Sequence, residues 1–255
     1  MKLTIDTDKQ VVAVTEADGR QVEQPLYSNE SFALLSGVWS KLAWNQKYTY
    51  GFSWMGRPII QLPEDMVRIQ ETIYRTKPDV VIETGVAHGG SLVFYASVLR
   101  AMGKGRVVGI DIEIRPHNRR TIEAHEMSSL ITLVEGSSTA PEIIKQVKDL
   151  VKPGERVMVI LDSNHTKAHV AKELELYAPM VTEGCYLVAT DGMMELLHDV
   201  PRGQADWSWD NPSAAAREFA QANSQFVLET TPFVFDETLS KHQITHWPDA
   251  YLRRR

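Results

Sequence analysis

Five short runs of valine, isoleucine and leucine, separated by helical stretches, constrain the fold of this chain most. The apolar runs occupy residues 80–83, 106–111, 130–134, 157–161 and 185–189. Helical spacing is expected between them, at residues 91–102, 117–127, 140–151 and 167–178. Continuous apolar strands that alternate with helices are typical of a parallel sheet covered on both faces. We therefore predict an α/β fold with a Rossmann-like, doubly wound, mostly parallel sheet.

The segments that flank this regular pattern are expected to extend the same domain. Before it, we predict a short hairpin over residues 3–14 with a turn at 17–20, a helix over 29–47, an aromatic loop over 48–58 and a helix from 63 to about 75. After it, a helix at 211–223 and strand-like pieces near 225–235 are expected. No linker divides the chain, so we predict one domain over residues 1–255. In it, 1–76 form an N-terminal helical and hairpin extension that caps the substrate side, 77–200 form the core, and 201–255 complete the sheet.

Charge and composition exclude several classes of protein. The net charge of −6 argues against a nucleic-acid partner, which needs a clustered basic face. The only basic run, at residues 253–255, is interpreted as a solvated tail. Cys185 is the single cysteine, so no internal disulfide is expected. The polar first residues and the absence of a long apolar run predict a cytoplasmic protein without a membrane partner.

Polar side chains follow each of the five predicted strands. Ligands of open α/β sheets bind beyond the carboxyl ends of the strands, where the strand order switches. The residues at these ends are Glu83, Asp111, Ser137, Ser138, Asp162 and Asp191. We therefore expect a ligand site at this edge of the sheet.

The turn after the first strand predicts a cationic ligand group. Glu83 precedes Gly85 and Gly89, and glycine permits close approach of the backbone to a ligand. The turn lacks the G-x-G-x-x-G pattern of dinucleotide sites, and an acid here would repel a pyrophosphate. Glu83 suits the amino group of S-adenosylmethionine better. His88 lies in the same loop and either contacts the ligand or lies on the surface; the alternative for the whole segment is an ordinary tight turn.

The next two strand ends fit the adenosine part of that ligand. An acid at the position of Asp111 commonly accepts hydrogen bonds from ribose hydroxyls. Ser137 and Ser138 could place small polar groups beside the adenine edge. The competing interpretation for both Asp111 and Ser138 is a helix cap.

The segment that begins at Asp162 predicts the chemistry. Asp162 ends a buried strand and His165 follows three residues later, which suits a metal-holding acid beside a proton acceptor. Metal coordination lowers the pKa of a bound oxygen far below the value of about 15.7 for water, and histidine, with an ordinary pKa of about 6.5, accepts protons near neutral pH. Asp191 is the natural second ligand, and oxygen ligands favour Mg²⁺. The alternative is that Asp162 caps a helix and His165 faces solvent.

Five stretches, taken in order, resemble one known family. They are residues 50–61 (YGFSWMGRPIIQ), 81–91 (VIETGVAHGGS), 109–112 (GIDI), 135–138 (EGSS) and 161–166 (LDSNHT). This pattern is similar to the cephalosporin hydroxylase family, which includes rhamnosyl and macrolide-sugar O-methyltransferases. The resemblance covers roughly residues 48–195.

The resemblance implies a class I methyltransferase fold with S-adenosylmethionine and Mg²⁺ as cofactors, and residues 77–200 as the cofactor-binding core. It implies that His165 is the base, acting with Asp162, and that Asp162 and Asp191 hold the metal. For the cofactor, it implies contacts from Glu83, Gly85, Asp111 and Ser137 or Ser138. The full set that we predict to contact the cofactor is Glu83, Gly85, His88, Gly89, Asp111, Ser137, Ser138 and Asp162. Where the sugar methyltransferases present two adjacent acids, this chain has Thr190 before Asp191, so Thr190 is a weaker expected metal ligand and Glu195 could compensate.

The predicted function is S-adenosylmethionine-dependent, Mg²⁺-assisted O-methylation of a small molecule, most simply a sugar of a glycosylated natural product or polysaccharide. One alternative is a nicotinamide-dependent oxidoreductase, which the missing glycine pattern and Glu83 disfavour. A second is an oxygenase or its partner, as the family name suggests, although non-haem iron usually needs two histidines and a carboxylate. A third is a non-catalytic S-adenosylmethionine-binding protein. The aromatic N-terminal helix also favours a homo-oligomer.

Overall fold

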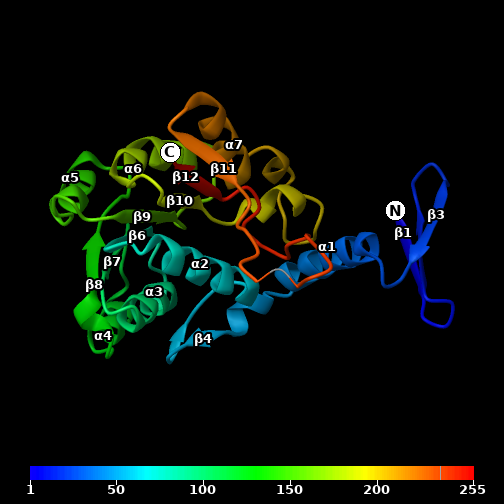
Figure 1. The fold of residues 1–255 in the computed structure, drawn as a ribbon, viewed down its shortest axis with the longest axis horizontal. Helices are drawn as coiled ribbons and strands as arrows, with labels where there is room; N and C mark the ends of the chain where they lie inside the picture. The colour runs from blue at the N-terminus through cyan, green and yellow to red at the C-terminus, as the bar shows by residue number, and fades with distance from the viewer. Residues whose placement is uncertain (236) are drawn as a thin grey trace.

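A seven-stranded sheet forms the centre of the molecule (Figure 1). The computed structural model describes residues 1–235 and 237–255. The strands are β6 (Val80–Thr84), β7 (Arg106–Asp111), β8 (Ile131–Glu135), β9 (Val157–Leu161), β10 (Tyr186–Ala189), β11 (Phe226–Glu229) and β12 (Tyr251–Arg254). Their order is β11-β12-β10-β9-β6-β7-β8, with β8, β7, β6, β9 and β10 parallel and β12 antiparallel to both neighbours. The predicted α/β fold with a mostly parallel sheet is confirmed.

Strand β12 corrects the interpretation of the basic C-terminal residues. Leu252 is buried and pairs with Leu187 of β10, while Arg253 forms an ion pair with Glu229 of β11 at 2.7 Å. The residues interpreted as a solvated tail therefore belong largely to the sheet. Only two apolar residues precede the arginines, which is too short a pattern to predict a strand. The strand-like region near 225–235 contributes only β11.

Six helices cover the two faces of the sheet (Figure 1). On one face lie α2 (Pro63–Thr76), α3 (Gly90–Ala101) and α4 (Pro116–Glu123); on the other lie α5 (Pro141–Asp149), α6 (Lys167–Tyr177) and α7 (Pro212–Ala222). The strands supply both cores by alternation: Val81 packs with the α2–α3 side and Ile82 with the α5–α6 side. Because both faces are covered, the strands need to be apolar at every position.

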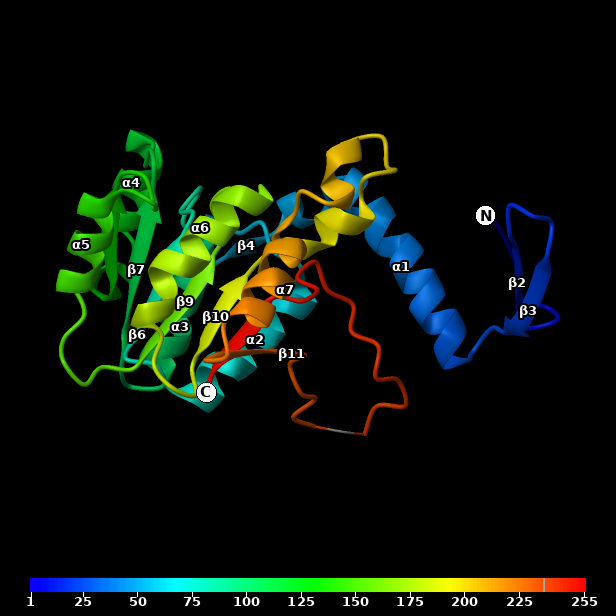
Figure 2. The ribbon, with the colours of Figure 1, turned by 90° about the horizontal axis from the view of Figure 1, so that it is seen from above.

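The N-terminal part lies apart from this body (Figure 2). A small antiparallel sheet consists of β1 (Lys2–Asp6), β2 (Val11–Thr15) and β3 (Gln21–Pro25), and α1 (Asn29–Asn45) leads from it to the body. The Ser28 hydroxyl caps α1 by accepting a hydrogen bond from the amide of Ser31 at 3.1 Å. The predicted helix is present, but the predicted hairpin is extended by a third strand.

The aromatic loop before α2 folds against the start of α3. It contains a 3₁₀ turn, η1 (Tyr48–Gly51), and a two-stranded ribbon, β4 (Ser53–Trp54) with β5 (Arg57–Pro58). A Cβ at Gly90 would collide with the carbonyl of Pro58, so the ribbon lies directly on the first turn of α3. The remaining 3₁₀ turns are η2 (Ser128–Leu130), η3 (Ala178–Met180), η4 (Gly192–Leu196) and η5 (Ala205–Ser208). This packing places residues 57–61 beside the loop that follows β6.

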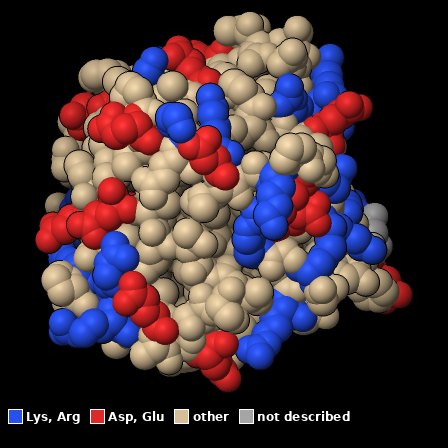
Figure 3. Space-filling model, turned by 90° about the vertical axis from the view of Figure 1, so that its left-hand side faces the viewer, with Lys and Arg blue, Asp and Glu red and all other residues tan. Residues whose placement is uncertain are grey.

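Acidic and basic side chains are interspersed on the face beside α4, α5 and β8 (Figure 3). Arg119 of α4, for example, pairs with Glu135 of β8 at 2.8 Å. Within the described residues, none of the helices combines the length and the apolar character that crossing a membrane requires.

Candidate active site

The candidate site lies where the strand order switches. Chain order continues from β6 to β7 on one side, whereas β9 and β10 lie on the other side of β6. The loops after β6 and β9 therefore diverge at this point and leave room for a ligand. The backbone amide of Asp162, after β9, donates to the carbonyl of Thr84 at 2.8 Å, which keeps the two strand ends together.

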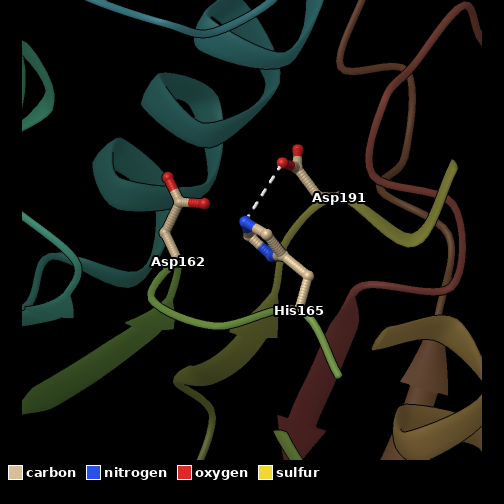
Figure 4. Close-up of side chains that lie close together, drawn as sticks. All are labelled: Asp162, His165 and Asp191. Carbon is tan, nitrogen blue, oxygen red and sulfur yellow. Dashed lines mark ion pairs between the residues drawn. The ribbon is translucent and has the colours of Figure 1, made fainter. Parts of the chain in front are cut away.

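Asp162, His165 and Asp191 point toward one another across this edge (Figure 4). One potential ligand atom from each lies within 4.8 Å of the others, and all three residues are partly buried. His165 Nε2 lies 3.5 Å from Asp191 Oδ2. Asp162 follows β9, His165 precedes α6, and Asp191 has a left-handed backbone (φ 57°) at the start of η4. Within the described residues, these three form the one such group of acids, histidines or cysteines.

The electrostatics of this group fit a divalent cation. Removal from water and the facing Asp191 carboxylate raise the pKa of Asp162 to about 7. Two carboxylates at this separation repel each other, and a cation between them would relieve the repulsion. Two hard oxygen donors suit Mg²⁺, which prefers oxygen over nitrogen ligands. The imidazole of His165 therefore remains available to exchange a proton.

Thr190 supports Asp162 through a hydrogen bond. Its buried hydroxyl lies 2.6 Å from Asp162 Oδ1 and 3.0 Å from the carbonyl of Leu161. The contact to Asp162 orients the carboxylate, a role that the sequence did not suggest. Glu195, considered as a compensating ligand, instead forms a two-pronged ion pair with Arg217 at 2.7 and 3.0 Å.

Two glycines shape the loop after β6. Gly85 has φ 96°, and a Cβ there would collide with the backbone carbonyl of Asp162. Gly89 has φ 78°, caps α3, and would place a Cβ against the side chain of Ile122. Both positions therefore require glycine for packing, in addition to any approach to a ligand.

Asp111 holds the same loop. Its Oδ2 accepts hydrogen bonds from the amides of Val86 at 2.9 Å and Ala87 at 3.1 Å, and its Oδ1 accepts one from the amide of Glu113 at 3.2 Å. The helix α4 begins later, after Arg115, so Asp111 is not the cap of that helix. A carboxylate can accept about four hydrogen bonds, so one further bond remains possible.

Glu83 is completely buried, and only one of its two carboxylate oxygens has a hydrogen-bond partner among the described residues. Its Oε2 accepts a hydrogen bond from the Ser91 hydroxyl at 2.6 Å, while Oε1 has no partner in the described part of the chain. Burial, followed by the nearby Asp162 carboxylate, raises the pKa of Glu83 well above its ordinary value. A buried carboxyl with an unused oxygen is well placed to receive a cationic ligand group.

Three residues near this loop were not identified from the sequence. Gln61 Oε1 is buried without a partner among the described residues and lines a hollow of about 50 Å³ beside the loop. Arg57 Nε donates to the carbonyl of His88 at 3.0 Å, and Asn118 Nδ2 donates to the carbonyl of Ala87 at 2.8 Å. Gln61 and Arg57 lie inside the YGFSWMGRPIIQ stretch, so this motif could have identified them as site residues. No motif or pattern in the sequence around Asn118 indicates its role.

The two serines after β8 lie near a buried glutamate. Ser138 Oγ lies 3.4 Å from His169 Nε2, which in turn lies 3.4 Å from Oε1 of the buried Glu173. The Ser163 hydroxyl donates to the same oxygen at 2.8 Å, which ties the Asp162 loop to α6. Neither Ser137 nor Ser138 caps α5, which begins without a side-chain cap.

The fold and the switch-point site define a class I methyltransferase architecture. CmcI with Mg and SAM is 18% identical, with a TM-score of 0.53 over 81% of this chain and 77% of that chain. MycE from the mycinamycin biosynthetic pathway, in complex with Mg, SAH and mycinamycin VI, is 18% identical, with a TM-score of 0.50 over 94% of this chain and 66% of that chain. At this identity, the two structures establish the fold.

The family follows from sequence. The model of the Rhamnosyl O-methyltransferase/CmcI family matches residues 46–255. A rhamnosyl O-methyltransferase of Mycobacterium leprae (strain TN) is 31% identical over 186 residues, 72% of this chain and 78% of that protein. A second, from Mycobacterium bovis (strain BCG / Pasteur 1173P2), is 34% identical over 159 residues, 60% of each. The chain belongs to the Rhamnosyl O-methyltransferase/CmcI family, which confirms the predicted family and enzyme class and favours a methyltransferase over an oxidoreductase.

Proposed function

We propose that this enzyme transfers the methyl group of S-adenosylmethionine to a hydroxyl of a sugar-bearing small molecule, with Mg²⁺ held by Asp162 and Asp191. The observation that carries the proposal is the convergence of Asp162, His165 and Asp191 within 4.8 Å at the switch point of the sheet. Thr190 contributes by orienting Asp162.

The loops after β6, β7 and β8 supply the cofactor contacts in this proposal. The unused oxygen of Glu83 receives the amino group of S-adenosylmethionine, and Gln61, which lines the hollow beside this loop, offers its unpartnered Oε1 to the same group. Asp111 accepts one further hydrogen bond from a ribose hydroxyl, and Ser137 and Ser138 border the adenine. The loop with Gly85, His88 and Gly89 lies between these groups, and its amides are already ordered by Asp111.

Methyl transfer requires activation of the acceptor hydroxyl, because the methyl group on the sulfonium of S-adenosylmethionine is already reactive. The acceptor oxygen forms a bond to the methyl carbon while the carbon–sulfur bond breaks, and the sulfur leaves as a neutral thioether. The hydroxyl proton goes to His165, whose Nε2 lies 3.5 Å from Asp191 Oδ2. When bound, Mg²⁺ supplies positive charge that lowers the pKa of a neighbouring hydroxyl. Asp162 and Asp191 hold this charge in position.

A groove beside Asp191 supports a sugar acceptor with an apolar portion. It has a volume of about 400 Å³ and lies between α1, η4 and residues 242–248. Met193 and Leu196, which follow Asp191 in η4, form part of its wall, and Leu34 and Val38 of α1 form another part. We infer a glycosylated natural product or a polysaccharide fragment as the acceptor, with a rhamnosyl group as the first candidate because the relatives from Mycobacterium carry that name.

The proposal is tested by incubating the protein with S-adenosylmethionine, Mg²⁺ and a panel of rhamnosides and other glycosides, followed by mass spectrometry. A methylated glycoside and an equal amount of S-adenosylhomocysteine are expected. His165→Ala should lower kcat by about 10²–10⁴-fold with cofactor affinity nearly unchanged. If S-adenosylmethionine binds but no glycoside yields S-adenosylhomocysteine, the protein is a non-catalytic binder and the proposal fails.

A further inference from the structure

The helix α1 carries large apolar side chains where it faces solvent. Its buried positions include the small residues Ser36 and Ser40, whereas Phe32 is 44% exposed, Leu42 is 59% exposed, and Trp39 is also exposed. A helix of a soluble protein normally buries its bulky apolar residues and exposes its polar ones. On α1, three bulky apolar residues are exposed, whereas Leu34, Leu35 and Val38 are half-buried. Such a surface indicates a contact that the single chain does not make.

The small sheet that precedes α1 has one apolar face. The register places Leu3 beside Val14 and Ile5 beside Val12, and Val14 in turn beside Val22, so these five side chains share a face. Ile5 is 50% exposed and Val22 is 47% exposed. An antiparallel sheet commonly packs one face against other structure, and Val12, on this face, is completely buried. This face, like α1, therefore lacks part of its cover.

Residues 1–45 form an arm whose small sheet lies away from the catalytic body, whereas its helix α1 contacts that body: Lys41, for example, forms an ion pair with Asp199 at 2.7 Å. Figure 2 shows the small sheet at the far end of α1, away from the seven-stranded sheet. The family match begins at residue 46, so the whole arm lies outside it.

The open edge of β1 is complementary to itself. The sheet order leaves β1 and β3 at the edges. If two β1 strands pair antiparallel about a two-fold axis at Thr4, each Lys2 lies opposite Asp6 of the other copy. The same operation on β3 would place Glu23 opposite Glu23 and would use Pro25, which has no amide hydrogen to donate. The charges and the available backbone amides therefore favour β1 over β3 as the edge that pairs with a second copy.

We propose that β1 pairs antiparallel with β1 of a second copy of this chain, which joins the two small sheets into one of six strands. The axis at Thr4 also places Leu3 opposite Ile5 on the apolar face, so that face becomes continuous across both copies. A closed two-fold contact of this kind ends at two chains. It is independent of the catalytic proposal.

The test uses two charge reversals in the full-length chain and measures mass by analytical ultracentrifugation. Lys2→Asp makes both paired positions acidic, and Asp6→Lys makes both basic. Each should raise the dissociation constant for the arm contact by about tenfold or more, because like charges then face each other twice. Each variant alone should therefore show half the assembly mass of the unaltered protein, and an equimolar mixture of the two should recover it.

The mixture of the two variants also shows whether a lower mass comes from charge repulsion or from a misfolded arm. Asp6 accepts hydrogen bonds from the amides of Asp8 and Lys9, so Asp6→Lys also weakens the turn after β1, and only a folded edge can recover the dimer. Arg20→Asp and Glu23→Lys, which reverse one positive and one negative charge of the arm away from the paired edge, should leave the mass unchanged. A monomeric unaltered protein, unchanged mass in both edge variants, or a mixture that stays at half mass would overturn the proposal.

Discussion

The carboxylate of Asp111 orders the loop after β6 and, in the proposed function, also binds the ribose of the cofactor. It already holds the amides of Val86 and Ala87, and the proposed ribose contact would add a charged hydrogen bond. We expect Asp111→Ala to weaken S-adenosylmethionine binding by roughly 1.5–3 kcal/mol, the range for a hydrogen bond to a charged group. Isothermal titration calorimetry measures this directly. Unchanged affinity would remove Asp111 from the cofactor site.

A substitution at Thr190 tests whether the orientation of the Asp162 carboxylate matters for catalysis. Thr190→Val keeps the shape of the buried side chain but removes the hydroxyl that contacts Asp162 Oδ1. We expect kcat to fall by about 10–100-fold, the equivalent of one hydrogen bond to a charged group, with little change in cofactor affinity. Thr190→Ser retains the hydroxyl and is the matched control. Equal activity of the two variants would show that this hydrogen bond is dispensable.

The position of a side chain at the end of a strand could be predicted from the sequence, because it follows from the position of the strand. Asp162, His165 and Asp191 do lie together, since the parallel strands deliver their ends to one edge. The contacts of Asn118 and Glu173 could not be predicted. Each lies within a helix, and its partner, Ala87 or Ser163, belongs to a loop of another element. Only the packing of helices on the sheet brings such pairs together.

At the scale of elements, Asp65 joins α2 to the segment that precedes β12. This buried carboxyl accepts hydrogen bonds from the Thr245 hydroxyl and from the amide of His246, the latter at 2.8 Å. Burial raises the pKa of Asp65 from 3.8 to about 7. Between these two values the folded chain holds a proton that the unfolded chain has lost. The contribution of this group to stability is therefore greatest at low pH and is lost as the pH rises toward 7.

Replacing Asp65 with asparagine should remove this pH dependence. Asp65→Asn retains an acceptor for the amide of His246 and cannot ionise. The wild type should lose up to about 1.4 kcal/mol per pH unit relative to the variant between about pH 4 and pH 7. Urea unfolding at several pH values measures the difference, with the exposed neighbour Glu64→Gln as control. Parallel curves for wild type and Asp65→Asn would contradict the assignment.

The elements that could be predicted are those with a long periodic pattern. Five strands and their helices were evident because each strand is apolar throughout, which follows from coverage on both faces. The third strand of the small sheet, β3, could not be predicted, since Val22 is its one large apolar residue. Strand β12 could not be predicted because its arginines are not typical of a buried strand; Arg253 is paired with Glu229, which belongs to the separate strand β11.

At the scale of the whole molecule, two parts with different tasks share one chain. Residues 46–255 form the family unit with the site at its switch point, and residues 1–45 form the arm. The groove between α1 and η4 connects them, because α1 belongs to the arm and η4 follows Asp191. An arm that fixes the position of α1 in a dimer would also fix one wall of the proposed acceptor groove.

We propose above all that Asp162, His165 and Asp191 activate the acceptor hydroxyl together with a divalent cation. The most direct measurement is the rate of S-adenosylhomocysteine release with a methylatable glycoside, first in excess EDTA and then after Mg²⁺ is restored. We predict that release nearly stops in EDTA and recovers with Mg²⁺, while S-adenosylmethionine still binds in both conditions. A full rate in excess EDTA would contradict the account, because the two carboxylates would then have no cation to hold.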